Sequence, residues 1–230
     1  MANLSVGTMS IGLQMVTPVN VTTRKILHAM HAEIIKRLHT GAIQTTIKRE
    51  TKKILNSSLR AQPEFQELTW EDSRLRAELG VKDSASAAEK LVRDWVRSTS
   101  VRISIPYIVG NQIVGPVITI QAIEADYQDV LSKAYASYTT KMGEIIPWLE
   151  WLLTRGVEIL VLNHAVFHPL IPTAASRTGT NTIMKKTDGG GWGVPTEWAG
   201  LPDDNWATRA VADAMPDIRT LLEHETIRRL

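Results

Sequence analysis

Cysteine is absent from this chain of 230 residues. Its absence excludes disulfides, thiolate metal sites, iron–sulfur clusters and cysteine nucleophiles, and nothing indicates an oxidising compartment. Hydrophobic residues make up 43% of the chain and charged residues 22%, which is too apolar for a wholly disordered protein. We therefore expect one main folded domain, in a cytosolic or intraviral setting.

Charged side chains are also missing from residues 1–23. The run has no basic start, and glycine, proline and polar residues interrupt it, so we expect neither a signal peptide nor a membrane span. Ile11, Leu13 and Met15 occupy alternate positions, as in a strand that lays one apolar face on a neighbour. The segment is either a disordered tail or an extended arm that adds a strand to a neighbouring subunit, and these three residues are candidate assembly contacts.

Residues 24–60 combine helical periodicity with positive charge. Apolar residues recur at helical spacing as far as His39, Gly41 interrupts the pattern, and a second helix follows. Nine Lys or Arg stand against two acidic residues in this region. The densest cluster comprises Lys48, Arg49, Lys52 and Lys53. The cluster is either a solvated helical face or a contact with DNA phosphates or an acidic partner, and the lack of aromatic residues disfavours single-strand stacking.

The remaining chain reads as a connector followed by alternating helical and strand patterns. The expected helices are 70–80, 84–96, 127–131, 144–153, 205–214 and 216–229. The expected strands form a hairpin over 101–123, kinked at Pro106 and Pro116, and a second pair at 158–164 and 180–186 with a glycine turn at 189–191.

This order of elements predicts the α+β class. We expect N-terminal and C-terminal helices packed on a small, mainly antiparallel β-sheet, with an extended N-terminal arm. The corresponding divisions are the arm at 1–23, a basic helical region at 24–60 and an α+β main domain at 61–230.

Motifs for catalysis and metal binding are lacking. His28 and His31 have no HExxH context, thiolate partner or third carboxylate ligand. The glycine run at 189–191 lacks the Lys-Ser or Lys-Thr of a phosphate loop, and no Gly-x-Ser-x-Gly elbow surrounds Ser137 or Ser176. We expect a protein without enzymatic activity, cofactor or metal.

Tryptophan is concentrated near the C-terminus, where the last 83 residues hold five of the seven. We expect most of these rings to anchor the core, and some to contact a neighbouring subunit.

The same C-terminal region carries a family resemblance. It contains ASYTTKMGEIIPWLEWLL, SRTGTNTIM and GWGVPTEWAGLPDDNWATRAV, a constellation that resembles virion structural proteins of tailed phages. RLRAELG at Arg74–Gly80 resembles neck or tail-completion proteins of long-tailed phages. The resemblance covers residues 60–215. It implies helices packed on a small antiparallel sheet, and identical copies that form a ring between portal and tail tube.

The resemblance implies a bacteriophage head–tail connector, made in the host cytoplasm and incorporated into the virion neck. Its partners would be further copies of itself, portal or adaptor proteins, and tail-tube or terminator proteins, with possible contact with packaged DNA and none with membrane. Candidate assembly contacts are Arg177, Trp192 and Trp198. Two alternatives stay open: another virion component (tail terminator, sheath-stabilising or baseplate subunit), and a nucleic-acid-binding module that uses the basic helices.

Overall fold

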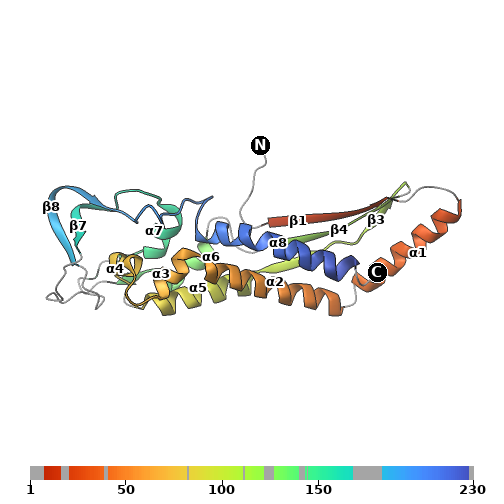
Figure 1. Ribbon diagram of the computed structural model, residues 1–230, viewed down its shortest axis with the longest axis horizontal. Helices are drawn as coiled ribbons and strands as arrows, with labels where there is room; N and C mark the ends of the chain where they lie inside the picture. Colours follow the sequence, from red (N-terminus) through yellow and green to blue (C-terminus); the bar gives the residue numbers. More distant parts are fainter. Residues whose placement is uncertain are drawn as a thin grey trace.

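The protein is elongated, with a helical body, a small sheet towards one end and a two-stranded hairpin at the other (Figure 1). This computed structural model describes residues 8–16, 21–38, 41–81, 83–110, 112–121, 127–139, 143, 145–167 and 183–227. Helices and small antiparallel sheets together confirm the α+β class. Within the described ranges, no helix combines the length and apolarity needed to cross a membrane.

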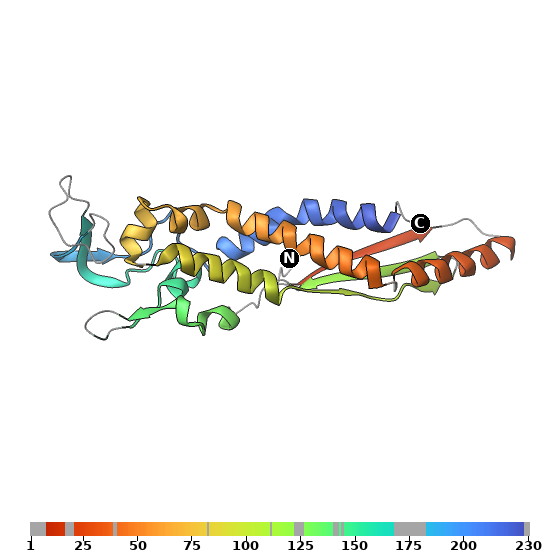
Figure 2. The same cartoon turned by 90° about the horizontal axis from the view of Figure 1, so that it is seen from below.

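Three long helices form the body: α2 (Gly41–Ala61), α5 (Ser84–Ser98) and α8 (Trp206–Ile227). The fourth, α1 (Val21–Leu38), lies at the sheet end, where Leu27 and Ile34 pack with Ile113 of the sheet (Figure 1). Helices α2 and α8 run side by side in opposite directions, and α5 packs against α2 (Figures 1 and 2). The residue ranges of α1 and α2 agree with the two helices that the sequence predicts in the basic region. Ile43, Ile47, Leu55 and Leu59 recur at helical spacing along α2 and are buried, which fixes the face that α2 turns inward.

Short helices fill the hairpin end of the body. They are α3 (Pro63–Thr69), α4 (Arg74–Leu79), α6 (Gln128–Leu131), the 3-10 turn η1 (Ala134–Ala136) and α7 (Trp148–Thr154). Ser73 caps α4, because its side chain accepts a hydrogen bond from the amide of Arg76. Gly80 ends α4 in the left-handed region with a φ of 68°, a conformation that favours glycine.

The larger sheet is built around strand β4 (Gln112–Gln121). On one side β4 pairs with β1 (Thr8–Val16), and on the other with β2 (Ser100–Ile103) and β3 (Tyr107–Val109), always antiparallel. Pro106 lies in the interruption between β2 and β3, as the expected kink there requires. The segment expected to be an arm thus contains a strand paired within its own chain.

Two smaller sheets complete the fold. Strands β5 (Tyr138–Thr139) and β6 (Ile145–Ile146) form one pair, and β7 (Val161–Phe167) and β8 (Ile183–Trp192) form the projecting hairpin. The β7–β8 register shifts between Leu162 and His164. Gly191 lies where β8 approaches Ile159 so closely that a Cβ atom would stand 2.2 Å from its Cγ2 atom. Only glycine fits this approach without movement of the neighbour.

The main core lies at the hairpin end and is rich in indole rings. Trp95, Trp148 and Trp206 are fully buried, and the rings of Trp95 and Trp206 meet edge to face at 5.4 Å. This confirms that tryptophans anchor the core. A second cluster joins α2, α8 and the sheet through Ile47, Ile120 and Ile218, among others.

Two expectations about local structure are wrong, and a third holds in part. The expected connector after residue 61 contains α3, in which Pro63 occupies the first turn and Leu68 is buried. The glycine run at 189–191 falls within the bounds of β8, but the pairing with β7 breaks between Lys186 and Gly191, and Gly190 has a φ of 76°, so the expected turn is present as an irregularity inside the strand. The two expected C-terminal helices are one, α8, with Pro216 inside it. Pro216 is exposed, so water can reach the carbonyl that it leaves without an amide partner.

Asn205 organises the start of α8. Its Oδ1 atom accepts hydrogen bonds from the amides of Ala207 and Thr208, capping the helix. Its Nδ2 atom lies 2.8 Å from the Tyr127 hydroxyl and 3.0 Å from the Leu153 carbonyl oxygen, and donates to them. Asn205 is fully buried. One side chain therefore connects α8 to α6 and α7.

Replacing Asn205 separates capping from donation. Asn205→Asp keeps an oxygen that caps α8 but replaces the donors with a buried carboxylate oxygen that faces carbonyl acceptors, so we expect a loss of about 2–4 kcal/mol in the free energy of unfolding. Asp203→Asn at the exposed neighbouring position should change it by no more than about 0.5 kcal/mol. Urea denaturation at pH 7 measures both. Equal stability of Asn205→Asp and the unsubstituted protein would contradict the role of the donors.

Candidate functional site

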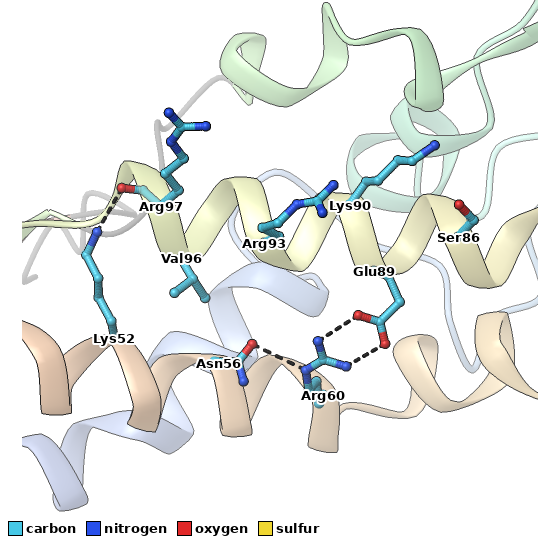
Figure 3. A pocket seen from close by; sticks show the side chains of 9 residues that line it. All are labelled: Lys52, Asn56, Arg60, Ser86, Glu89, Lys90, Arg93, Val96 and Arg97. Atoms are coloured by element: carbon cyan, nitrogen blue, oxygen red, sulfur yellow. Dashed lines mark hydrogen bonds and ion pairs between the residues drawn. The ribbon is translucent and has the colours of Figure 1, made fainter.

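A groove of about 560 Å³ lies between α2 and α5 (Figure 3). Most of its lining side chains are polar or basic. They are Lys52, Asn56, Arg60, Ser86, Glu89, Lys90, Arg93, Val96 and Arg97. The α2 residues are four apart and the α5 residues follow a three-four spacing, so each helix contributes one face to the groove. The lining thus brings together five basic side chains and one carboxylate.

Two contacts between the helices fix the width of this groove (Figure 3). Arg60 donates two hydrogen bonds to Glu89, with Nη1–Oε1 at 2.5 Å and Nη2–Oε2 at 2.6 Å. This paired geometry lowers the pKa of the Glu89 carboxyl, with the Arg60 hydrogen bonds as the largest cause. Towards the other end, Lys52 donates from Nζ to the backbone carbonyl of Arg97 at 2.8 Å.

The other three basic side chains follow α5. Lys90, Arg93 and Arg97 are exposed, and their charged groups form no ion pair with any residue among the described ranges. In Figure 3 the side chains of Lys90 and Arg97 extend to the side of α5 away from α2. The pKa of Lys52 is lowered, first by partial burial and then by the positive charges of Lys48 and Arg97. Positive charge is therefore concentrated here without full compensation.

Only one member of the basic cluster expected from the sequence lines this groove. Lys52 does so, whereas Arg49 and Lys53 form ion pairs with Glu50 at 2.7 and 3.0 Å, and Lys48 is exposed elsewhere on α2. Sequence reasoning missed the α5 row. The sequence does indicate this row, because Lys90, Arg93 and Arg97 are three and four residues apart and share one face of an expected helix. The denser cluster of basic residues within 24–60 was preferred to it.

The candidate assembly residues lie in different environments. Ile11, Leu13 and Met15 belong to β1, where Ile11 pairs with Ile118 and Met15 with Ile113 of β4. The structure describes no part of the segment that contains Arg177. The role of these residues as contacts with a neighbouring subunit stays a prediction.

The two tryptophans of the candidate assembly set are occupied within the chain. Trp192 is buried and donates from its indole nitrogen to Glu78 Oε2 at 3.0 Å. Trp198 is partly buried, and the Arg74 guanidinium lies over its ring at 5.9 Å. Trp198 retains some exposed surface, whereas Trp192 offers little to a partner.

Exposed apolar side chains gather towards both ends of the molecule. Ile105, Tyr107 and Val109 alternate along and before β3 and are 58%, 55% and 56% exposed. Near the hairpin the exposed set includes Val157, Ile159, Leu162, Phe167 and Leu201. Such surface favours contact with another protein when it is contiguous.

A buried carboxylate lies beneath the start of α8. Arg209 donates to Glu64 of α3 and, at 2.9 Å, to Asp204. Burial raises the pKa of the Glu64 carboxyl, and the Arg209 charge partly offsets this effect. Glu64 is almost fully buried, and the other charged group near it, the Asp204 carboxylate, repels it. The attraction between Arg209 and Glu64 therefore holds α8 against α3.

Histidine and carboxylate side chains do not converge elsewhere in the described ranges. No group of three or more potential metal ligands occurs there. His31 Nε2 lies 2.8 Å from the Pro106 carbonyl oxygen, and His164 Nδ1 lies 2.8 Å from that of Leu162, so each imidazole has a backbone partner.

Comparison with known proteins gives no relatives for this chain. No protein-family model matches it, and neither a curated protein nor a solved structure does so.

Removing the partner of Glu64 should make stability depend on pH. Arg209→Met leaves a buried carboxylate without its cation, so we expect a loss of about 2–4 kcal/mol at pH 7. Without Arg209, the folded-state pKa of Glu64 rises further above its unfolded value. The folded state then binds the proton more tightly, and stability increases as pH falls from 7 to 5. The gap to the unsubstituted protein should narrow over this range.

A double variant provides the control. Glu64→Gln/Arg209→Met has no buried charge, so it should recover part of the loss at pH 7 and lack the additional pH dependence. Urea denaturation at both pH values measures each effect. A constant gap between Arg209→Met and the unsubstituted protein would contradict the role of Glu64.

Proposed function

We propose that this chain is a structural subunit of a tailed-phage particle. Copies of it form an oligomeric ring at the neck, which joins the portal and head to the tail and leaves a passage for DNA. The proposal rests on the sequence resemblance, and one structural observation carries it further: the motif residues that bear this resemblance hold the fold together through internal contacts.

The contacts of the motif GWGVPTEWAGLPDDNWATRAV support a structural role. Trp192 donates to Glu78, Asn205 caps α8, and the Trp206 indole donates to the Leu59 carbonyl oxygen at 2.8 Å. Arg209 is occupied by two carboxylates. These polar groups position the helices and are therefore not free to bind a ligand. The function then depends on the exposed surfaces of the folded chain.

The available surfaces suit subunit assembly. In the described part of the sheet, β4 is central and β1 and β2 lie at the edges, where backbone groups can pair with another chain. The exposed apolar side chains towards both ends can fill seams between different faces of neighbouring copies. Contacts between unlike faces generate a ring when the rotation closes.

Two alternatives differ in what they require. Another virion component, such as a tail terminator, sheath-stabilising or baseplate subunit, would use the same edges and apolar seams. A nucleic-acid-binding module would depend on positive charge, and the observation that favours it is the basic lining of the α2–α5 groove.

Solution mass tests the ring proposal. We expect multi-angle light scattering to give a ring-sized multiple of the monomer mass, either alone or after addition of the portal protein from the same genome. Tyr107→Lys places a charge in the apolar strip of β3 and should weaken this assembly by roughly tenfold or more. Thr220→Lys, at an exposed position of α8, should leave the mass unchanged.

The comparison of Tyr107→Lys with Thr220→Lys is valid only if both variants keep the fold of the unsubstituted protein. Circular dichroism and thermal unfolding should agree between the two variants, because both side chains are exposed. A protein that stays monomeric at high concentration, both alone and with the portal protein, would overturn the proposed function. If Tyr107→Lys assembles as well as the unsubstituted protein, β3 is not part of the contact between neighbouring copies.

A further inference from the structure

The basic row of α5 is defined by Lys90, Arg93 and Arg97. These positions rise along the helix by about 4.5 and 6 Å, so the row spans about 10 Å. Lys52 of α2 lies at one end of the same groove, where its ammonium group is held by the Arg97 carbonyl. Lys90, Arg93 and Arg97 therefore present an open row of cations on α5, and Lys52 adds a fourth charge beside one end of this row.

A linear polyanion matches this row. Each strand of duplex DNA carries a continuous line of phosphates, so a row of this length can contact more than one phosphate of the same strand. A small phosphate ligand would need donors that converge on one point, whereas Lys90 and Arg97 lie at the two ends of the row (Figure 3). The geometry thus favours an extended anion over a compact one.

The lining also distinguishes a phosphodiester backbone from an acidic peptide. Most peptide-binding modes use a free strand edge or an apolar groove, whereas acidic motifs are bound by clusters of Arg side chains. Here both walls are helices, and Val96 is the one aliphatic side chain in the lining. Asn56 and Ser86, in contrast, belong to types that commonly donate to phosphate and sugar oxygens.

We propose that the groove between α2 and α5 binds the phosphodiester backbone of a nucleic acid, with Lys90, Arg93, Arg97 and Lys52 as its cationic contacts. Binding is independent of sequence, because the contacts are to phosphates. The lining contains no aromatic ring on which the bases of a single strand could stack, so a duplex is the expected form. Arg60 is excluded from the contact set, since Glu89 occupies its guanidinium. The inference does not depend on ring formation.

Fluorescence anisotropy with a labelled DNA duplex of mixed sequence tests this site. Three to four phosphate contacts predict a slope of about −3 for log affinity against log salt, so affinity should fall by roughly 40- to 150-fold between 50 and 200 mM NaCl. Arg93→Gln/Arg97→Gln should weaken binding by roughly tenfold at 100 mM NaCl and reduce the size of the slope by about two.

A control with the same change in charge separates local contact from overall charge. Lys185→Gln/Lys186→Gln removes two exposed cations from β8, at the hairpin end, and should retain the affinity and slope of the unsubstituted protein. Both double variants should unfold at the same temperature, because none of the four side chains forms an ion pair within the described ranges.

Three results would overturn the inference. They are no DNA binding at 50 mM NaCl, equal loss of affinity in the two double variants, and competition by polyglutamate of matched charge as strong as that by unlabelled DNA. The last result would assign the groove to an acidic protein partner. Light scattering of the Arg93→Gln/Arg97→Gln variant should show unchanged assembly, so failure at the groove and failure of the ring proposal are distinguishable.

Discussion

The packing of α2 against α8 is the contact on which the other elements depend. Ile43 and Ile47 of α2 pack with Ile218 and Leu222 of α8 beneath the sheet. The C-terminal half of α2 and the N-terminal half of α8 pack in the tryptophan-rich core. Because the two helices are long and antiparallel, buried surface is distributed along a line. The molecule is elongated for this reason, with both ends far from its centre (Figure 2).

Charge is balanced in some parts of this body and unbalanced in others. Arg74 and Arg155 each contact two carboxylates, and Arg209 holds α3 against α8. These pairs stabilise local geometry, and most are exposed enough that each contributes little to stability. The row on α5 differs, since nearby like charges repel and Glu89, which Arg60 already pairs, offsets them only in part. Such an arrangement costs some stability in the isolated chain, and a bound anion would relieve that cost.

Local pattern predicted much of the fold and little of its long-range pairing. The periodicity of α1 and α2, and the stop at Gly41, follow from residues close in sequence. Contact between Arg60 and Glu89, or Lys52 and Arg97, arises only once α2 and α5 pack together. The groove was therefore beyond a reading of residues 24–60 alone. The glycine run keeps its turn character inside β8, where the pairing with β7 breaks between Lys186 and Gly191.

The position of β4 constrains the order in which the chain is made and folded. Its first partner, β1, leaves the ribosome about a hundred residues earlier and must wait for β4 before it can pair. Similarly, the apolar face of α2 waits for α8, the last helix described. A nascent chain consequently carries uncovered apolar surface through most of its synthesis. Apolar surface that stays uncovered during synthesis favours aggregation of the unfinished chain, a risk set by the order of the elements along the sequence.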